Sequence, residues 1–460
     1  MGRRPRRDGR AQRRSTGGNH LLTRAGGVRR PGVESLVRQL VTGAGGGGGG
    51  VVHRPLGAPG GATFPLTHLR DTPPSRRCGL PVLVVPGGPG LASAVPYRTW
   101  RRRAASLGID ALMVEHRGVG LSRRDAGGRD LPVPAVTVES VVDDLAAVLD
   151  DDGVERAVVY GASYGSYLAQ AFALRHPQRV AALVLDSPML SAVDDVSAVR
   201  AHRRRLLWDG LLEDGDEPAL AGAAAAVREL GSRAQGDGRT SQQQAERMTE
   251  LMTELMTELT AVVTLVHEFA GPDALRRLVT ARGQGRLRWL WSWLAELGAS
   301  EASSSVTRFI SEPDLVAGIA YGQLGFGQPP DGGPLDPQLI HAEAAKSRPA
   351  FAGEPFDLVA ALQRAAFPVV VLSGDRDLTT PRPVAERAVA LAPQGLLVEL
   401  PGTGHSALEV HREASLFVAR AVADGDLDRL RDPVVIERLP RRGLSPLAGS
   451  ALRAVIRAAT

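Results

Sequence analysis

The sequence predicts an α/β fold in which a mostly parallel sheet is covered by helices on both faces. From residue 51 onward, short apolar runs alternate with helical patterns, and this alternation is typical of βαβ units. The runs are continuously apolar, as expected for parallel strands that are buried on both faces. Between about residues 190 and 362 no strand pattern occurs. We therefore expect one sheet whose chain is interrupted by a long helical insertion.

The expected sheet has eight strands. Phe64–Leu69 and the region near Val51–His53 are expected to form an antiparallel hairpin at the start of the sheet. The other six strands are apolar runs, namely Val82–Val85, Ala111–Glu115, Ala157–Tyr160, Ala182–Leu185, Val369–Leu372 and Leu396–Leu400. Helical patterns lie between the runs, and the clearest are Val138–Leu149 and Ser163–Arg175.

These patterns divide the chain into five parts. They are an Arg- and Gly-rich extension expected to be disordered (1–50), the first part of the core (51–190), a helical cap (191–362), the second part of the core (363–423) and a C-terminal tail (424–460). The cap contains a tandem Met-Thr-Glu-Leu repeat at 248–259, in a pattern that is helical throughout. The tail is Arg-rich and partly helical by pattern, and we assign it no function.

The basic charge of the chain is concentrated in the extension. The net charge is +5, but residues 1–50 hold 11 arginines against Asp8 and Glu34, so the rest of the chain carries −4. The extension lacks the apolar run of a secretion signal, and no stretch is long enough to span a membrane. We expect it to be solvated, with contact to nucleic acid or an anionic surface as the alternative, and we expect a cytoplasmic protein. Cys78 is the only cysteine, which excludes an intrachain disulfide and a cysteine-based metal cluster.

The sharpest local signal is Gly161-Ala162-Ser163-Tyr164-Gly165, which follows an apolar strand and precedes a helical pattern. A G-x-S-x-G motif in this context is the nucleophile elbow of α/β-hydrolases, in which a strained turn lifts the serine hydroxyl above the sheet. Side chains at the glycine positions would clash with the strand or the helix. The alternative is an ordinary Gly-rich turn. The motif therefore predicts Ser163 as a nucleophile.

A second glycine-rich loop, Pro86-Gly87-Gly88-Pro89-Gly90, directly follows the strand Val82–Val85. The elbow architecture requires a partner loop at this place, whose backbone N–H helps to stabilise the oxyanion. We expect the oxyanion hole to be formed by the amide of Gly87 or Gly88 and the amide of Tyr164. The alternative for this loop is a tight Pro/Gly turn.

The acid is expected after a later strand, where Asp375 and Asp377 both follow Val369–Leu372. We favour Asp377, because one of the two carboxylates can serve to cap the turn or to pair with Arg376. Asp186, at the end of the strand after the elbow, is the other acid within reach of the base.

The base is expected on a loop after the last strand, and Gly402-Thr403-Gly404-His405 fits this place. His411 is a neighbouring competitor, but it falls in the following helical pattern. The order Ser163, Asp377, His405 along the chain is the order of the α/β-hydrolase architecture. The sequence therefore predicts an α/β-hydrolase with this triad, and it shows no metal-ligand spacing. No cofactor or metal is expected.

Taken together, five segments resemble the proline iminopeptidase group of α/β-hydrolases and the related tripeptidyl aminopeptidases. They are Pro86–Gly90, Glu115–Ser122, Gly161–Gly165, Gly374–Pro381 and Gly402–His405. The resemblance implies a helical cap, where this chain has its insertion, and release of N-terminal residues of peptides through an acyl-enzyme. It also implies that Arg117 and Ser122 belong to a loop that buttresses the site. The chain departs from the group at Pro86, where a histidine is usual, and at Tyr164, where a tryptophan is usual.

The resemblance further implies cap carboxylates near aromatic residues, which hold the free amine of the peptide. Trp289, Trp291 and Trp293 form the aromatic cluster of the insertion, and Glu296 follows closely. We assign substrate binding to Trp293 and Glu296, with Glu268 and Glu312 as the other options. The alternative is that the tryptophans pack the cap helices and the glutamates are solvated.

Three functions remain compatible with these residues. The first is an aminopeptidase acting on short peptides, possibly with proline first. The second is an esterase or amide hydrolase that uses the same triad on a small acyl substrate. The third is a non-catalytic ligand-binding protein that keeps the fold. The expected partner is a small peptide or acyl substrate, without nucleic acid or membrane, and the oligomeric state is not predicted.

Overall fold

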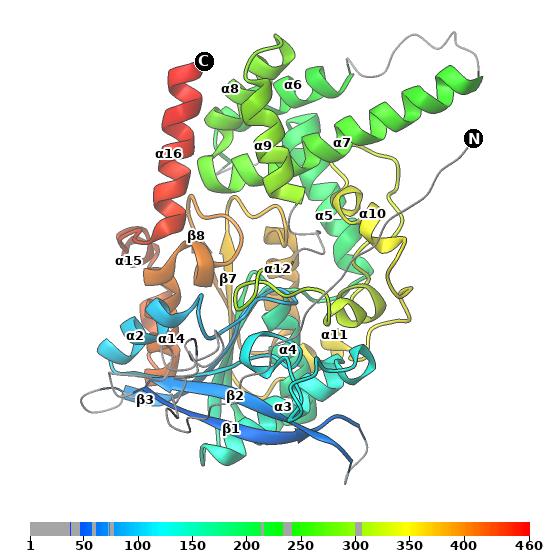
Figure 1. Cartoon of the computed structure of the whole chain (residues 1–460). Coiled ribbons are helices and arrows are strands. Elements are labelled where there is room, and N and C mark those ends of the chain that lie inside the picture. Colours follow the sequence, from blue (N-terminus) through cyan, green and yellow to red (C-terminus); the bar gives the residue numbers. More distant parts are fainter. Residues whose placement is uncertain are drawn as a thin grey trace, which may run out of the picture.

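The structure is a computed structural model, and it describes residue 37 and residues 47–57, 61–71, 73, 78–212, 216–232, 242–299 and 306–460. The described part of the chain contains an eight-stranded sheet with the order β1-β2-β4-β3-β5-β6-β7-β8 (Figure 1). The strands are β1 Gly47–Pro55, β2 Thr63–Asp71, β3 Cys78–Val85, β4 Ile109–Val114, β5 Ala157–Ala162, β6 Val180–Asp186, β7 Val369–Gly374 and β8 Gly395–Leu400. The predicted fold class and all the predicted strands are therefore confirmed.

Strand pairing follows the prediction of an antiparallel hairpin that leads into a parallel sheet. β1 pairs with β2 and β2 pairs with β4 in antiparallel register, and the remaining pairs are parallel. β1 begins at Gly47, so Gly47–Gly50 belong to the sheet, although we expected them in the disordered extension. The rest of that extension, except residue 37, lies outside the described residues.

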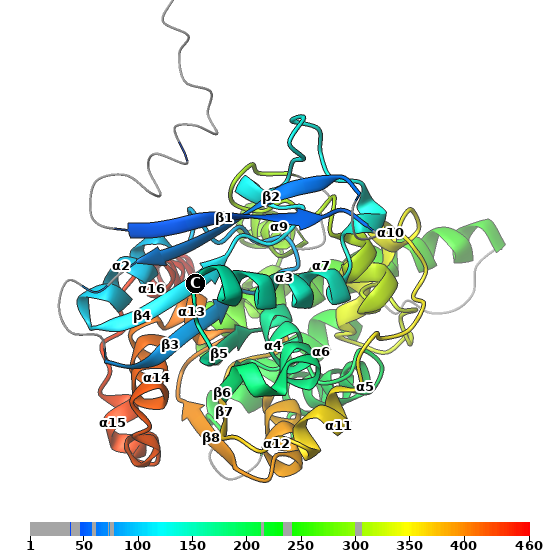
Figure 2. The ribbon, with the colours of Figure 1, turned by 90° about the horizontal axis from the view of Figure 1, so that it is seen from below.

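Both faces of the sheet are buried, which explains the continuous apolar runs. Successive strand residues alternate between two cores, as in β5, where Val159 faces one core and Val158 the other. The first core contains α3 Val138–Asp151, α4 Tyr164–Arg175, α11 Leu358–Gln363 and α12 Arg382–Leu391. The second contains α2 Arg98–Ser106, α13 Ala407–Val410 and α14 Arg412–Asp424. Figure 2 shows the two helix layers on opposite sides of the sheet.

The segment between β6 and β7 forms the helical cap that was predicted. Besides α11, which packs on the first core, the α-helices of this segment are α5 Asp194–Arg204, α6 Ala219–Ser232, α7 Gln242–Ala270, α8 Pro272–Gly283, α9 Arg288–Ala299 and α10 Ala342–Ala345. The Met-Thr-Glu-Leu repeat lies within α7. The cap has a hydrophobic core of its own, and Leu378 from the loop after β7 enters this core. The cap is thereby fixed to the loop that carries the predicted acid.

Short helices of other kinds connect these elements. The 3-10 helices are η1 Gly120–Ser122, η2 Val133–Ala135, η3 Pro177–Arg179, η7 Pro337–Ile340 and η8 Leu427–Leu430. The π-helices are η4 Arg205–Asp209 and η6 Gly318–Gln323. None of the described helices combines the length and the apolar character that a bilayer crossing needs.

The C-terminal tail is helical and packs against the cap. It contains α15 Pro433–Glu437 and α16 Leu444–Ala459. Figure 1 shows α16 beside the cap helix α8, and contacts join α16 to both α7 and α8. Ile456 is completely buried in the cap core, and a Cβ at Gly449 would lie 2.3 Å from the carbonyl oxygen of Phe269. The tail therefore joins the second part of the core to the cap.

Candidate active site

Ser163 lies at a strained turn between β5 and α4. Its backbone has φ 50° and ψ −121°, a conformation that non-glycine residues rarely adopt and that costs about 1–3 kcal/mol. The motif needs glycine at Gly161 and Gly165 because a side chain would not fit at either position. A Cβ at Gly161 would lie 2.2 Å from the oxygen of Gly165, and a Cβ at Gly165 would lie 1.9 Å from the oxygen of Val85. The turn therefore has the geometry of a nucleophile elbow.

The surroundings hold the serine at the end of the sheet. The backbone N–H of Ser163 donates to the carbonyl of Asp186, at the end of β6, over 2.8 Å. Ser166 donates its hydroxyl to the carbonyl of Ser163. Ser163 also directly precedes the first residue of α4, and the N-terminus of a helix favours negative charge. The side chain is half-buried, so it is held in place and still accessible.

The glycine-rich loop after β3 lies against the serine, as predicted. A Cβ at Gly87 would lie 3.3 Å from the Cβ of Ser163 and 3.9 Å from its Oγ. Gly88 has φ 127°, and a Cβ there would lie 2.6 Å from the backbone nitrogen of Gly90. The absence of side chains thus allows the backbone of this loop to approach the serine closely.

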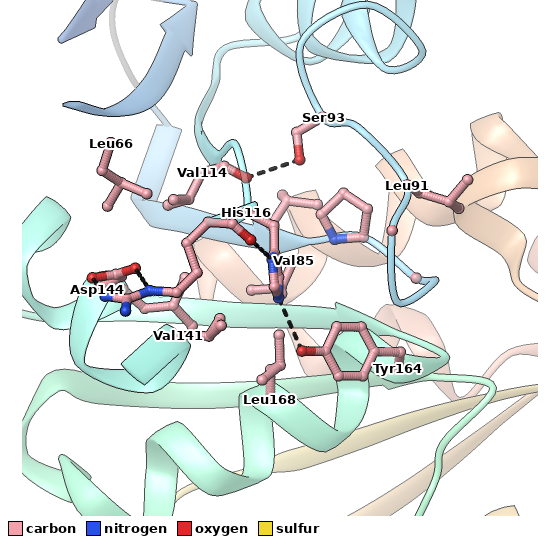
Figure 3. A pocket seen from close by; sticks show the side chains of 16 residues that line it. Leu66, Val85, Leu91, Ser93, Val114, His116, Val141, Asp144, Tyr164 and Leu168 are labelled. Carbon is pink, nitrogen blue, oxygen red and sulfur yellow. Dashed lines mark hydrogen bonds and ion pairs between the residues drawn. The ribbon is translucent and has the colours of Figure 1, made fainter. Parts of the chain in front are cut away.

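Behind this loop is a small cavity into which the side chain of Tyr164 projects (Figure 3). The Tyr164 hydroxyl lies 3.0 Å from Nε2 of His116, and His116 Nδ1 lies 2.6 Å from the carbonyl oxygen of Arg117. Burial lowers the pKa of His116 to about 4, so the ring is neutral. Because Nδ1 must donate to the carbonyl, Nε2 accepts from Tyr164. This contact fixes the ring of Tyr164, and no motif in the sequence had pointed to it.

The buttress implied by the family resemblance is present beside this cavity. Arg117 donates to both carboxylate oxygens of Asp144 over 2.6 Å. The hydroxyl of Ser122 accepts the backbone N–H of Thr67 on β2. Neither side chain contacts Ser163 among the described residues, so both support the site from behind.

Asp377 is the carboxylate that contacts the predicted base. Nδ1 of His405 lies 3.0 Å from Oδ2 and 3.1 Å from Oδ1 of Asp377. The same carboxylate accepts the backbone N–H groups of Thr379 and Thr380. Burial raises the pKa of Asp377, but His405 and these donors outweigh burial and lower the pKa below its usual value. Asp377 is therefore charged, and it holds His405 with a proton on Nδ1.

The other candidate acids have different partners. Asp375 is exposed and accepts the backbone N–H groups of Gly402 and Thr403, so it braces the loop that carries His405. Asp186 is buried and accepts the N–H groups of Ala407 and Leu408 at the start of α13. Both carboxylates therefore position the base loop through its backbone.

His405 and Ser163 lie at the same edge of the sheet, but no hydrogen bond joins their side chains. The two are linked through the end of β6, where Asp186 accepts from Ser163 and Ser187 Oγ accepts the N–H of Ser406 over 2.9 Å. In the described part of the chain, the Ser163 hydroxyl makes no hydrogen bond. Catalytic hydrogen bonds are often long in unliganded enzymes and shorten when substrate binds. His411, the competing histidine, lies at the start of α14 and is buried.

One cap residue, Glu268 on α7, lies directly over the acid and the base. Its carboxylate accepts the N–H of Leu378 over 2.9 Å and the hydroxyl of Thr379 over 3.1 Å. A Cβ at Gly404 would lie 2.7 Å from the Cβ of Glu268. Burial lowers the pKa of His405, but Asp377 and, more weakly, Glu268 raise it above the usual value. Glu268 was one of our other options for substrate binding, and the structure brings it to the predicted triad.

The structure does not bring Trp293 and Glu296, the cap residues favoured from the sequence, to the predicted triad. Trp293 is 53 % exposed on α9, and Glu296 is also exposed. Neither contacts Ser163, Asp377 or His405 among the described residues. Trp291 of the same cluster is buried and donates to Glu258 of α7, so it packs the cap. Glu312 is buried as well, and Arg308 and Arg123 surround its carboxylate. Across the described residues, no three His, Cys, Asp or Glu side chains form a metal-binding group.

Comparison with known proteins agrees with this geometry. The family model described as alpha/beta hydrolase fold matches residues 81–222. A probable proline iminopeptidase of Streptomyces coelicolor is 29% identical over 178 residues, which are 35% of this chain and 54% of that protein. A homoserine O-succinyltransferase of Leptothrix cholodnii is 42% identical over 85 residues, 18% of this chain and 22% of that protein. The chain thus spans about half the length of the first relative and less of the second.

Among solved structures, the proline iminopeptidase of Mycobacterium smegmatis is 18% identical with a TM-score of 0.46, covering 82% of this chain and 99% of that one. The sheet order, the strained elbow and the matching family model agree on one fold. The chain therefore has the alpha/beta hydrolase fold, and part of its sequence is similar to a probable proline iminopeptidase.

Proposed function

We propose that this α/β-hydrolase is a serine hydrolase in which Ser163 is the nucleophile, His405 the general base and Asp377 the orienting acid. The observation that carries the proposal is the charged, buried Asp377 in contact with Nδ1 of His405, at the sheet edge where Ser163 has its strained turn. With the proton held on Nδ1, the lone pair on Nε2 is available to accept the serine proton.

The proposed reaction has two acyl-transfer steps. Ser163 Oγ attacks the substrate carbonyl while Nε2 of His405 takes the hydroxyl proton, and the backbone amides of Gly87 or Gly88 and of Tyr164 stabilise the oxyanion. His405 then gives the proton to the leaving group, and an acyl-enzyme remains. In the second step His405 removes a proton from water, which attacks the ester and releases the acid and the free serine.

For the substrate, we propose a short peptide from which the N-terminal residue is released. The motifs resemble the proline iminopeptidase group, and a probable proline iminopeptidase is among the relatives. Glu268 adds a cap carboxylate next to the loops of Asp377 and His405, where it can attract the ammonium group of a peptide N-terminus. Trp293 and Glu296, favoured from the sequence, stay a weaker proposal because both are exposed.

The substrate class is tested with matched substrates on the full chain. Prolyl-p-nitroanilide and N-acetylprolyl-p-nitroanilide differ only in the free amine, and p-nitrophenyl acetate reports plain ester hydrolysis. An aminopeptidase should cleave the first substrate with a kcat/KM at least about tenfold above that of the second. Equal rates on both anilides, or turnover of the ester alone, would favour the esterase or amide hydrolase.

A separate experiment tests the triad itself. A fluorophosphonate probe should label the wild-type chain and should fail to label Ser163→Ala, and turnover should fall by on the order of 10⁶. Ser106→Ala is a matched control, because Ser106 is exposed at the end of α2 and also donates to a backbone carbonyl. Labelling that persists in Ser163→Ala would refute the assigned nucleophile, and no labelling of wild type would favour the non-catalytic protein.

A further inference from the structure

A second pocket, next to the acid loop, is lined by four arginines from three separate elements. Arg277 lies on α8, Arg376 directly precedes Asp377, and Arg453 and Arg457 lie on α16. The pocket is thus formed where the cap, the core and the tail meet. The backbone of Ala270–Ala274, at the start of α8, forms part of its wall.

The carboxylates of the pocket do not balance these cations. Glu217 pairs with Arg376 over 3.1 Å. Asp273 pairs with Arg277 over 2.9 Å and also with Arg276, which lies outside the pocket lining. Four guanidinium groups therefore face two carboxylates, and one of these two is shared with an arginine outside the pocket.

The two arginines of α16 have no carboxylate partner among the described residues. Arg453 donates to the carbonyl of Phe269 and to the hydroxyl of Ser450, which are both neutral. Arg457 makes no ion pair or side-chain hydrogen bond in the part of the chain that the structure describes. Two positive charges at the pocket are thus left without compensation.

Arg376 has an unusual position for a cation. A Cβ at Gly271, the residue before α8, would lie 2.7 Å from Nη1 of Arg376, so the guanidinium lies against the N-terminus of a helix. This end of a helix carries a partial positive charge that favours anions, and Gly271 offers no side-chain cap. Nε of Arg376 is also buried without a hydrogen-bond partner. An anion in the pocket, beside both the guanidinium and the helix end, would offset this repulsion.

Arg441, which lies outside the pocket lining, makes the surroundings more positive. Burial lowers the pKa of Arg441, and the neighbouring cations Arg376 and Arg453 lower it further, although Asp375 acts in the opposite direction. Asp375 is itself engaged by the backbone N–H groups of Gly402 and Thr403. The positive potential therefore extends from the pocket toward the base loop.

We propose that this pocket is a binding site for an anionic group, a carboxylate or a phosphate. Guanidinium groups bind both through paired hydrogen bonds, and the N–H groups at the start of α8 add further donors. The bound anion would contact the cap, the acid loop and the tail at the same time, and so would fix these three parts relative to one another.

The proposal is tested by calorimetric titration of the full chain with inorganic phosphate and, separately, with succinate. Wild type should bind at least one of the two, and the comparison shows which anion the pocket prefers. Arg457→Gln should weaken binding about tenfold, and Arg453→Gln with Arg457→Gln should weaken it further. Arg438→Gln, directly after α15 and outside the pocket lining, removes the same charge and should leave binding unchanged.

Three results would overturn the proposal. The first is that wild type binds neither phosphate nor succinate at low ionic strength, and the second is that the double variant binds as tightly as wild type. The third is that Arg438→Gln weakens binding as much as Arg457→Gln, since binding would then follow net charge alone. Arg453 and Arg457 are exposed, and the thermal midpoint of each variant shows that the fold is retained.

Discussion

His405 Nδ1 lies 3.0 Å from Oδ2 of Asp377, whereas Asp375, two residues earlier, contacts only the backbone of the same base loop. The two carboxylates of one short turn thus have separate tasks. Asp377 holds the imidazole, and Asp375 holds the chain that carries it.

This division predicts unequal effects for two matched substitutions. Asp377→Asn keeps the shape of the side chain but removes its charge and disturbs the tautomer of His405, so kcat should fall about 10⁴-fold. Asp375→Asn keeps an oxygen that can accept one backbone N–H, so kcat should fall less than about tenfold. Steady-state kinetics on the same substrate compare the two. Equal losses would mean that the acid is misassigned.

Glu268 predicts a pH effect that can be measured. Its carboxylate raises the pKa of His405, because negative charge stabilises the imidazolium. Catalysis needs the neutral imidazole, so activity should rise as the pH increases through this pKa. Glu268→Gln should therefore move the acidic limb of kcat/KM against pH to lower pH, by about half a pH unit or more.

The control for this experiment is Glu296→Gln, which removes the same charge from an exposed position on α9. We expect it to leave the acidic limb where it is in wild type. A shift in Glu296→Gln as large as that in Glu268→Gln would show that the pH effect does not come from the neighbourhood of the base.

The tight elbow predicts a stability effect at Gly165. A Cβ there would lie 1.9 Å from a backbone oxygen of β3, and backbone cannot move aside as a flexible side chain can. Gly165→Ala should therefore lower the free energy of unfolding by about 3 kcal/mol or more. Gly57→Ala is the control, since nothing lies within 4 Å of a Cβ at Gly57. Urea titration measures both, and a stable Gly165→Ala variant would contradict the geometry.

The sequence predicted the core better than the cap, for a physical reason. A parallel strand buried on both faces must be continuously apolar, so β3 and β5 to β7 were recognisable from short runs, and the motif glycines mark turns where no side chain fits. The contacts of the cap depend on how whole helices dock. Periodicity identifies the apolar face of a helix, but it does not reveal which helix end meets the acid loop. We therefore favoured Glu296 from the sequence and kept Glu268 only as another option, and it is the packing of α7 that brings Glu268 to the acid loop.

The contacts of the C-terminal tail, like those of the cap, could not be predicted from the sequence. Arg441, between α15 and α16, donates to the carbonyls of Gly402 and Pro401 and to the hydroxyl of Thr403. These three residues lie in the same loop as His405, shortly before it in the chain. Arg441 is therefore a positioning residue, and its removal should loosen the base without changing its chemistry.

Arg441→Ala should lower kcat about tenfold with little change in KM, because two or three hydrogen bonds to the base loop are lost. Arg441→Lys should recover part of the activity, since the ammonium group can replace one donor but not the forked geometry. Arg442→Ala removes the neighbouring exposed charge and should keep full activity. If Arg441→Ala and Arg442→Ala behave alike, the tail does not position His405, because the two arginines differ in their contacts with the base loop and not in their charge.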